Sequence, residues 1–236
     1  MKTWICTESL APLRVEPSHR AECSTQMLFG EPAHVLERAE DWVRIRCGLD
    51  GYTGWMGAGA LREVETSGTG KTFWGKRPYE KAGFDGRMVW VPDGAWVVDS
   101  PLILLPPAGR TPSPDSFFER FHDAPYLWGG KTFAGIDCSG LSQLFYRLCF
   151  GAFLPRDASL QAQTGLCVPF ERRAAFDAAF FGNEKITHVG IVAKDCERLV
   201  HAAGSGRVRM DKLTSDGIVA NGVLTHKLVF LRRYLG

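Results

Sequence analysis

Short runs in which apolar and polar residues alternate fill the first quarter of this 236-residue chain. The clearest runs are 34–36, 42–46 and 52–56, and turn-forming residues such as those at 49–51 separate them. A period of two is typical of strands that bury one face, and short turns join such strands into hairpins. We therefore predict that residues 1–65 form a small all-β barrel.

A less regular pattern follows from residue 66 to residue 112. Residues 66–70 have the composition of a linker, and the prolines at 106–114 indicate a stiff connector. Between these segments, the apolar runs 87–91 and 95–98 flank a Pro-Asp-Gly sequence, which is typical of a hairpin turn. We predict a linker that carries either this β-hairpin or a degenerate second barrel.

Helical periodicity begins only after residue 112. A short helix is predicted to end near Phe121, and a second helix at 139–150 places Leu141, Leu144 and Leu148 on one buried face. Strand-like runs follow at 176–181, 188–193, 198–202, 207–210 and 227–232. Helices followed by antiparallel strands predict an α+β fold for residues 113–236.

The composition is that of an ordinary globular protein, and it excludes several functions. The net charge is only +2 and lysines and arginines form no cluster, so neither nucleic acid nor a membrane is an expected partner. No stretch approaches the roughly 18 apolar residues of a membrane span. The N-terminus also lacks the apolar core of a secretory signal, so the protein is predicted to be cytoplasmic if Met1 is its natural start. The oligomeric state is left open.

The chain has seven cysteines, and one of them lies where catalysis is favoured. Their odd number, with no CxxC pair and no cysteine/histidine cluster at zinc spacing, predicts reduced thiols, no metal and no cofactor. Cys138 differs because it lies at the start of the helix predicted at 139–150, where free backbone N–H groups stabilise a thiolate or an oxyanion. This position predicts a thiol pKa below the ordinary value of about 8.5, and Gly140 allows close approach.

A nucleophilic cysteine also needs a base. His188 opens one predicted strand and His201 ends the next, so the two rings are expected to lie side by side in an antiparallel sheet. One histidine would accept the thiol proton and the other would orient the first. The remaining histidines, including His226 near the C-terminus, lack such a placement.

These residues lie in segments that resemble a known family. The sequences YLWGG at 126–130, DCSGL at 137–141, HVGI at 188–191 and HAAGSG at 201–206 together resemble the NlpC/P60 cysteine peptidases, which are papain-like enzymes of the cell wall. The resemblance covers about residues 113–236, and it implies a papain-like catalytic domain.

The N-terminal region is similar to a second family. The sequence DGYTGWM at 50–56 resembles bacterial SH3 domains. Residues 66–112 are expected to be a linker with a hairpin or a degenerate second SH3-like element. Together the two parts resemble the γ-D-glutamyl-L-diamino acid endopeptidases. The expected fold class is thus α+β, with an NlpC/P60 domain preceded by an all-β SH3-like barrel.

The resemblance implies catalytic roles for three residues. Cys138 is the expected nucleophile, and His188 is the base that later protonates the leaving amine. His201 orients His188. Tyr126 is expected to line the site and donate to the oxyanion, and Ser139 to contact the substrate.

The resemblance also implies residues that bind the substrate. Tyr52 of the barrel and Asp137 are expected to bind the free amine of the substrate. Trp128 belongs to the substrate-binding segment, and Arg156 and Asp157 shape the wall of the cleft.

The implied activity is hydrolysis of the γ-D-Glu–diamino acid bond in murein tripeptides or tetrapeptides with a free N-terminal L-alanine, as in the recycling of cell-wall peptides. Two alternatives remain from the sequence. The first is a papain-like amidase or acyltransferase with another substrate, and the second is a non-catalytic peptidoglycan-binding protein.

Overall fold

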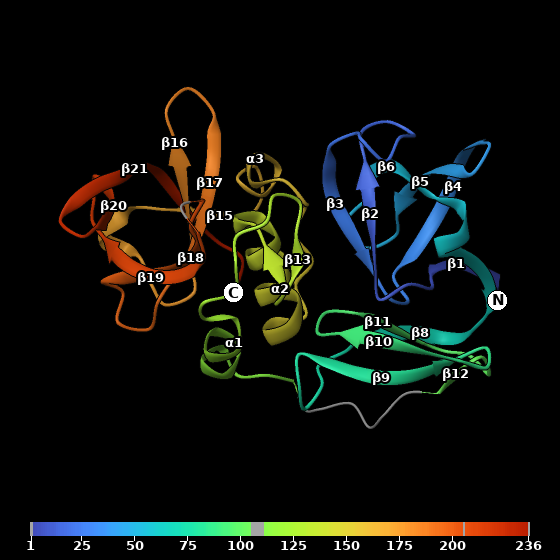
Figure 1. Ribbon diagram of the computed structural model, residues 1–236. Coiled ribbons are helices and arrows are strands. Elements are labelled where there is room, and N and C mark those ends of the chain that lie inside the picture. Colours follow the sequence, from blue (N-terminus) through green and yellow to red (C-terminus); the bar gives the residue numbers. More distant parts are fainter. Residues whose placement is uncertain (1, 105–110, 205, 236) are drawn as a thin grey trace.

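The computed structural model describes residues 2–104, 111–204 and 206–235. Most of the proline-rich connector predicted at 106–114 lies outside the described residues. Figure 1 shows three regions: an N-terminal β region, a smaller β region beneath it, and a C-terminal region of helices and strands.

The N-terminal region is a seven-stranded antiparallel sheet in the order β3-β2-β6-β5-β4-β1-β7. Its strands are β1 (Lys2–Cys6), β2 (Leu10–Arg14), β3 (Cys23–Leu28), β4 (Pro32–Ala39), β5 (Trp42–Cys47), β6 (Thr53–Gly57) and β7 (Leu61–Glu65), with the 3₁₀ helix η1 (Ala58–Ala60) before the last. Alternate residues such as Leu13, Val43 and Met56 form a core of their own. The strands predicted from the period-two pattern are present.

The middle region pairs its strands differently from the prediction. It comprises β8 (Ser67–Thr72), β9 (Tyr79–Phe84), β10 (Arg87–Pro92), β11 (Trp96–Asp99) and β12 (Ile103–Leu104). β10 pairs with β9 and β11 pairs with β8, so the predicted hairpin between 87–91 and 95–98 is wrong, and the predicted linker forms part of β8.

Burial of the predicted turn explains this difference. Asp93 is 2% exposed, and its carboxylate accepts hydrogen bonds from the Gly75 amide (2.9 Å) and from Arg120 (2.8 Å). The Gly94 amide donates to the Phe73 carbonyl (2.8 Å). These tertiary bonds direct the chain away from β10 and toward β8, which a local hairpin signal does not encode.

The C-terminal region places helices before a sheet, which confirms the predicted α+β class. The helices are α1 (Pro114–Phe121), α2 (Cys138–Phe150), α3 (Ala158–Gln161) and the 3₁₀ helix η2 (Phe170–Arg172). The strands are β13 (Lys131–Thr132), β14 (Gly135–Ile136), β15 (Leu166–Val168), β16 (Ala178–Gly182), β17 (Ile186–Val192), β18 (Arg198–Ala202), β19 (Val208–Leu213), β20 (Gly217–Ala220) and β21 (Val223–Arg233). Because β21 pairs with both β16 and β20, six of these strands close into a ring.

Helix α2 lies at the centre of the molecule, between the C-terminal strands and the two N-terminal regions (Figure 1). The Asp137 side chain caps its N-terminus by accepting from the Gly140 amide (2.7 Å), and Gly151 ends it in the left-handed conformation with φ 68°. Residues 138–148 are all buried, so the helix contacts neighbours on every side.

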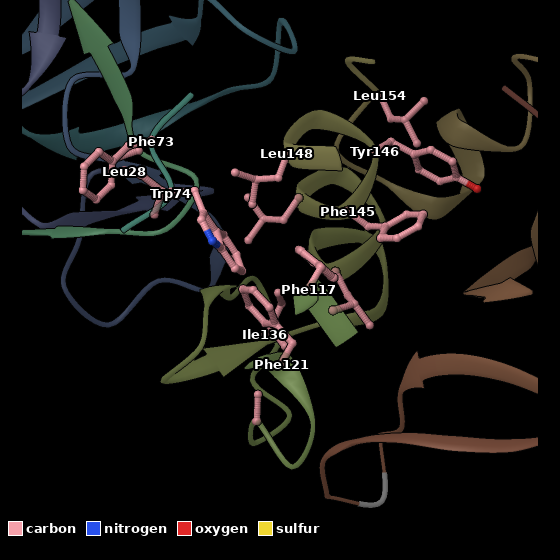
Figure 2. Close-up of a cluster of buried hydrophobic side chains, with 14 of the residues drawn as sticks. Leu28, Phe73, Trp74, Phe117, Phe121, Ile136, Phe145, Tyr146, Leu148 and Leu154 are labelled. Carbon is pink, nitrogen blue, oxygen red and sulfur yellow. The ribbon is translucent and has the colours of Figure 1, made fainter. Parts of the chain in front are cut away.

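One hydrophobic core joins all three regions (Figure 2). Leu28 from the barrel, Phe73 and Trp74 from the middle region, and Phe117 and Leu148 from the helices belong to a single buried cluster. The position of the barrel relative to α2 is therefore set by packing rather than by a linker.

A buried ion cluster strengthens this junction. Glu31 of the barrel, 3% exposed, pairs with Lys131 (3.2 Å) and with Arg147 of α2 (2.9 Å). Its second oxygen also accepts from the Leu28 amide (3.0 Å), and Arg147 donates to the Gly94 carbonyl in the middle region. One carboxylate thus connects all three regions.

Candidate active site

Cys138 is the first residue of α2, as the sequence predicts, and it is 6% exposed. The Gly140 amide is taken by the Asp137 side chain and the Leu141 amide by the Asp137 carbonyl. The two amides before them, those of Cys138 and Ser139, are the ones available to an oxyanion at the helix N-terminus.

Burial works against ionisation of this thiol. It raises the pKa of Cys138 to about 12, and the Asp137 carboxylate adds to the effect, while the Val189 amide and the Arg156 charge oppose it. From the helix N-terminus alone, the sequence predicted a lowered pKa for Cys138. Burial and the Asp137 charge act in the opposite direction. A thiol in this environment depends on a nearby base to take its proton.

His188 and His201, the predicted base and its partner, lie together on neighbouring strands. His188 is the third residue of β17 and His201 is in β18, and Nε2 of His188 lies 2.8 Å from Nδ1 of His201. The side-by-side placement expected from the sequence is therefore present. Burial lowers the pKa of His188 well below its usual range, and the neighbouring His201 and His226 act in the same direction. His188 is therefore a neutral imidazole, the form that accepts a proton.

Two further residues of this cluster were missed by the sequence reasoning. The Asp211 carboxylate of β19 lies 2.9 Å from Nε2 of His201, and the ring of His226 stacks on that of His188 with centroids 4.4 Å apart. Arg209 is directly opposite His201 in the sheet, and Asp211 lies two residues further along β19. Knowledge of the β18–β19 register would therefore have identified Asp211. His226 comes from β21, and only closure of the ring of strands brings it here.

Asp137 is held by hydrogen bonds on every side. Arg156 donates to both of its carboxylate oxygens (3.0 and 2.6 Å), and the Gly129 amide donates to Oδ2 (2.8 Å) in addition to the capping bond from Gly140. Arg156 also donates to the Ser139 hydroxyl (2.7 Å). The carboxylate is thus already neutralised, which weakens its expected role as the partner of a substrate amine.

Arg156 extends this network into the barrel. Its side chain is 1% exposed, and its Nε donates to the Thr25 hydroxyl of β3 (2.6 Å). A planar guanidinium can serve a carboxylate with two nitrogens and a hydroxyl with the third, which an ammonium group cannot do. The sequence assigned Arg156 to the cleft wall, and the structure shows that it also joins the helix N-terminus to the barrel.

A cavity of about 540 Å³ opens beside Cys138, between the barrel and the helices. Its lining includes the expected residues Tyr52, Trp128, Asp137, Ser139, Arg156 and Asp157. Tyr52 and Asp137 thus face one cavity although 85 residues separate them in the chain. Tyr126 is not among the described lining residues, but it is close enough to Cys138 and Asp137 for their charges to add to burial in raising its pKa to about 12.

Glu22 is a cavity residue that the sequence reasoning did not identify. Trp128, 59% exposed, also lines the cavity, and its Nε1 donates to the Glu22 carboxylate of the barrel (2.6 Å). Among the described residues, neither Glu22 nor the lining residue Asp157 forms a salt bridge. Burial raises the pKa of Asp157, and the nearby Arg156 charge partly opposes that rise. The cavity therefore presents two carboxylates that form no salt bridge within the described residues.

The described parts of the chain contain neither a metal-binding cluster nor a membrane-spanning helix. Within residues 2–104, 111–204 and 206–235, no group of three histidine, cysteine or acidic side chains is arranged to hold a metal ion. No helix in the same ranges combines the length and the hydropathy needed to cross a membrane.

Comparison with known proteins agrees with this geometry. Residues 13–61 match the bacterial dipeptidyl-peptidase SH3 domain, and residues 123–225 match the NlpC/P60 family. A γ-D-glutamyl-L-lysine dipeptidyl-peptidase from Bacillus subtilis is 27% identical over 225 residues, which cover 78% of this chain and 73% of that protein. A protein of the same name from Bacillus cereus is 24% identical, with coverages of 83% and 72%.

A solved structure has the same architecture throughout. The crystal structure of an NlpC/P60 family protein from Bacillus cereus covers 100% of both chains with a TM-score of 0.77 at 18% identity. The thiol of Cys138 and the imidazoles of His188 and His201 are the kinds of group that a cysteine peptidase uses. The chain therefore carries an N-terminal bacterial SH3 domain followed by an NlpC/P60 peptidase domain.

Proposed function

We propose that this peptidase cleaves the γ-D-Glu–diamino acid bond of murein tripeptides or tetrapeptides that have a free N-terminal L-alanine. The observation that carries the proposal is the cavity beside Cys138, which the barrel closes on one side with Val15, Glu22, Ser24 and Tyr52. Its volume is in the range of roughly 300–1,000 Å³ typical of small-ligand sites. The names of the two Bacillus relatives support the same substrate class.

A cavity with the barrel as one wall selects short substrates. The acyl side of the substrate occupies the space between Cys138 and the barrel, so a peptide can extend only a short way before it meets the barrel wall. A murein peptide that is still linked to glycan through its N-terminus does not fit such a site. Exclusion therefore contributes to specificity in addition to attraction, and it favours released cell-wall peptides of the kind handled in recycling.

The free amine needs a negative partner inside this cavity. Tyr52 and Asp137 were expected to bind it, and both line the cavity. Because Arg156 already pairs with Asp137, we assign most of the attraction to the carboxylates of Glu22 and Asp157, which form no salt bridge within the described residues. An ammonium group that binds there is both charge-compensated and hydrogen-bonded.

The chemistry then follows from the residues at the cavity edge. His188 accepts the proton of Cys138, and the thiolate attacks the γ-carbonyl carbon of D-glutamate. The amides of Cys138 and Ser139, together with the Tyr126 hydroxyl, stabilise the oxyanion. The imidazolium of His188 then protonates the leaving amine of the diamino acid, and water releases the dipeptide from the thioester.

The test is hydrolysis of L-Ala-γ-D-Glu-diaminopimelate and its L-lysine counterpart, each in free and N-acetylated form. The wild-type protein should cleave the free peptides, and Cys138→Ala should not. Acetylation removes the ammonium charge and should lower kcat/KM by at least about 100-fold, which corresponds to one lost charge-assisted contact of about 2.7 kcal/mol. Equal turnover by wild type and Cys138→Ala would disprove the proposal.

Glu22→Gln tests the amine site separately. This variant should lose part of the discrimination between free and acetylated peptides. Glu16→Gln is the matched control, because Glu16 is an exposed carboxylate on the same part of the barrel and does not line the cavity. If Glu22→Gln discriminates as well as Glu16→Gln, the amine is bound elsewhere. Adding a free amine acceptor to the reaction distinguishes hydrolysis from acyl transfer by its products.

A further inference from the structure

A hydrogen-bonded row runs through the catalytic cluster and ends on a carboxylate. Nε2 of His188 lies 2.8 Å from Nδ1 of His201, and Nε2 of His201 lies 2.9 Å from Oδ2 of Asp211. The side chains of His201 and Asp211 are 1% and 10% exposed. Little water therefore competes for these bonds, and each nitrogen in the row has to be either a donor or an acceptor.

The carboxylate at the end of the row is ionised. Arg209 donates to both oxygens of Asp211, from Nε and from a terminal nitrogen, at 2.7 Å each. Partial burial of Asp211 acts to raise its pKa, but the hydrogen bonds from Arg209 and His201 outweigh burial and lower it. An ionised carboxylate is only an acceptor, so Nε2 of His201 has to carry the proton.

The proton on Nε2 of His201 determines where the other protons of the two rings lie. Burial lowers the pKa of His201, so at neutral pH the ring has a single proton, and that proton is on Nε2. Its Nδ1 is then an acceptor, which requires Nε2 of His188 to donate. His188 is also neutral, so its Nδ1 carries a lone pair. Sγ of Cys138 lies against the amide of Val189, the residue that follows His188.

We propose that Asp211 is a positioning residue that fixes the tautomers of His201 and His188, so that Nδ1 of His188 is the nitrogen ready to accept the Cys138 proton. Without the carboxylate, His201 is free to carry its proton on Nδ1. His188 then accepts at Nε2 and is protonated on Nδ1, which makes it unable to take the thiol proton. The inference rests on the proposed roles of Cys138 and His188, but it does not depend on the identity of the peptide substrate.

The first experiment observes the tautomers in the wild-type protein directly. Long-range ¹H–¹⁵N spectra of the imidazole rings, with assignment by His188→Gln and His201→Gln, should show both rings protonated on Nε2 and unprotonated on Nδ1 at pH 7. A proton on Nδ1 of either ring would overturn the proposal. The tautomers are observed in the wild-type protein, and the two variants serve only to assign its signals.

The second experiment removes the carboxylate. Asp211→Ala should show a mixture of tautomers at His188 and a loss of roughly 100-fold to 10,000-fold in kcat with little change in KM, since general base catalysis is worth about that much. The matched control is Asp195→Ala, which removes another carboxylate paired with an arginine, Arg198, on an exposed turn away from the histidines. The control should retain the wild-type tautomers and kcat.

Alkylation of Cys138 by iodoacetamide, followed by mass spectrometry of its peptide, separates this inference from the substrate assignment. In wild type the rate at pH 7 depends on proton transfer to His188. In Asp211→Ala it should fall by at least about tenfold and recover only as pH rises toward the pKa of the thiol itself. A wild-type alkylation profile in Asp211→Ala would overturn the proposal even if the peptide tested is not a substrate. If the wild-type protein has a normal alkylation profile but does not cleave the peptide, only the substrate assignment is overturned.

Discussion

Replacing Glu31 by glutamine should show how strongly the three regions are held together. Glutamine has the shape of glutamate but no charge, and it places an amide donor next to two other donors. Lys131 and Arg147, whose side chains are 5% and 6% exposed, would then be buried cations without an anion. Breaking a buried ion pair by removing one partner costs about 3–5 kcal/mol, and here one carboxylate serves two cations.

That free energy translates into a measurable change in melting. For a chain of this size, each kcal/mol lowers Tm by about 2–4 °C, so Glu31→Gln should melt about 6–20 °C below wild type. The assay is thermal or urea unfolding followed by circular dichroism. Glu8→Gln is the matched control, because Glu8 also links the barrel to the middle region, through Arg87, but with side chains 44% and 48% exposed. That exposed pair should contribute about 0–1 kcal/mol.

A triple variant checks the cause. Changing Glu31 to leucine and both Lys131 and Arg147 to methionine removes all three charges together, and it should recover most of the lost stability because no unpaired ion remains. If Glu31→Gln costs no more than the Glu8→Gln control, the reasoning is refuted, and the buried ion cluster does not hold the regions together. If the triple variant is as unstable as Glu31→Gln, the cost does not come from unpaired charge.

Two further predictions concern the active-site helix and pH. Gly140→Ala should destabilise the protein by about 1–3 kcal/mol and reduce activity, because its Cβ would lie 2.4 Å from the carbonyl oxygen of Gly130. Unchanged melting and kcat would contradict this prediction. Burial lowers the pKa of both His188 and His201 below the ordinary histidine pKa of 6.5. Below pH 6.5 the unfolded chain therefore binds more protons than the folded protein, and the free energy of unfolding falls as the pH drops. Each histidine contributes up to about 1.4 kcal/mol per pH unit to this loss. Asp93 partly offsets it, because burial raises the pKa of Asp93 to about 6 and its protonation then favours the folded state as pH falls. Equal urea midpoints at pH 7.5 and 5.5 would contradict this prediction.

Local signals in the sequence predicted some elements well and others wrongly. The helix at 139–150 was predicted because an apolar face, a capping residue and Gly151 all agree within one short stretch. The hairpin at 87–98 failed because a Pro-Asp-Gly sequence marks a turn without saying which strands pair on either side of it. Asp93 is buried against Arg120 of a distant helix, and that contact decided the pairing.

The candidate site divides in the same way. Cys138, His188 and His201 each lie in a distinctive local sequence, at a helix start or within a strand, so motif and placement identified them together. Asp211 and His226 have no such local context, and strand register or ring closure brings them to the cluster. Spacing along the chain contains no information about such neighbours.

The sequence by itself therefore determined the fold class, the order of the regions and the three residues expected to carry the chemistry, because these depend on periodicity and short motifs. Only the tertiary structure decided the electrostatics of the site. It paired Arg156 with Asp137, placed Glu22 and Asp157 in the cavity without a salt bridge among the described residues, and buried Cys138 so that its pKa rises. The physical reason is that burial and charge interactions depend on distances between residues far apart in the chain.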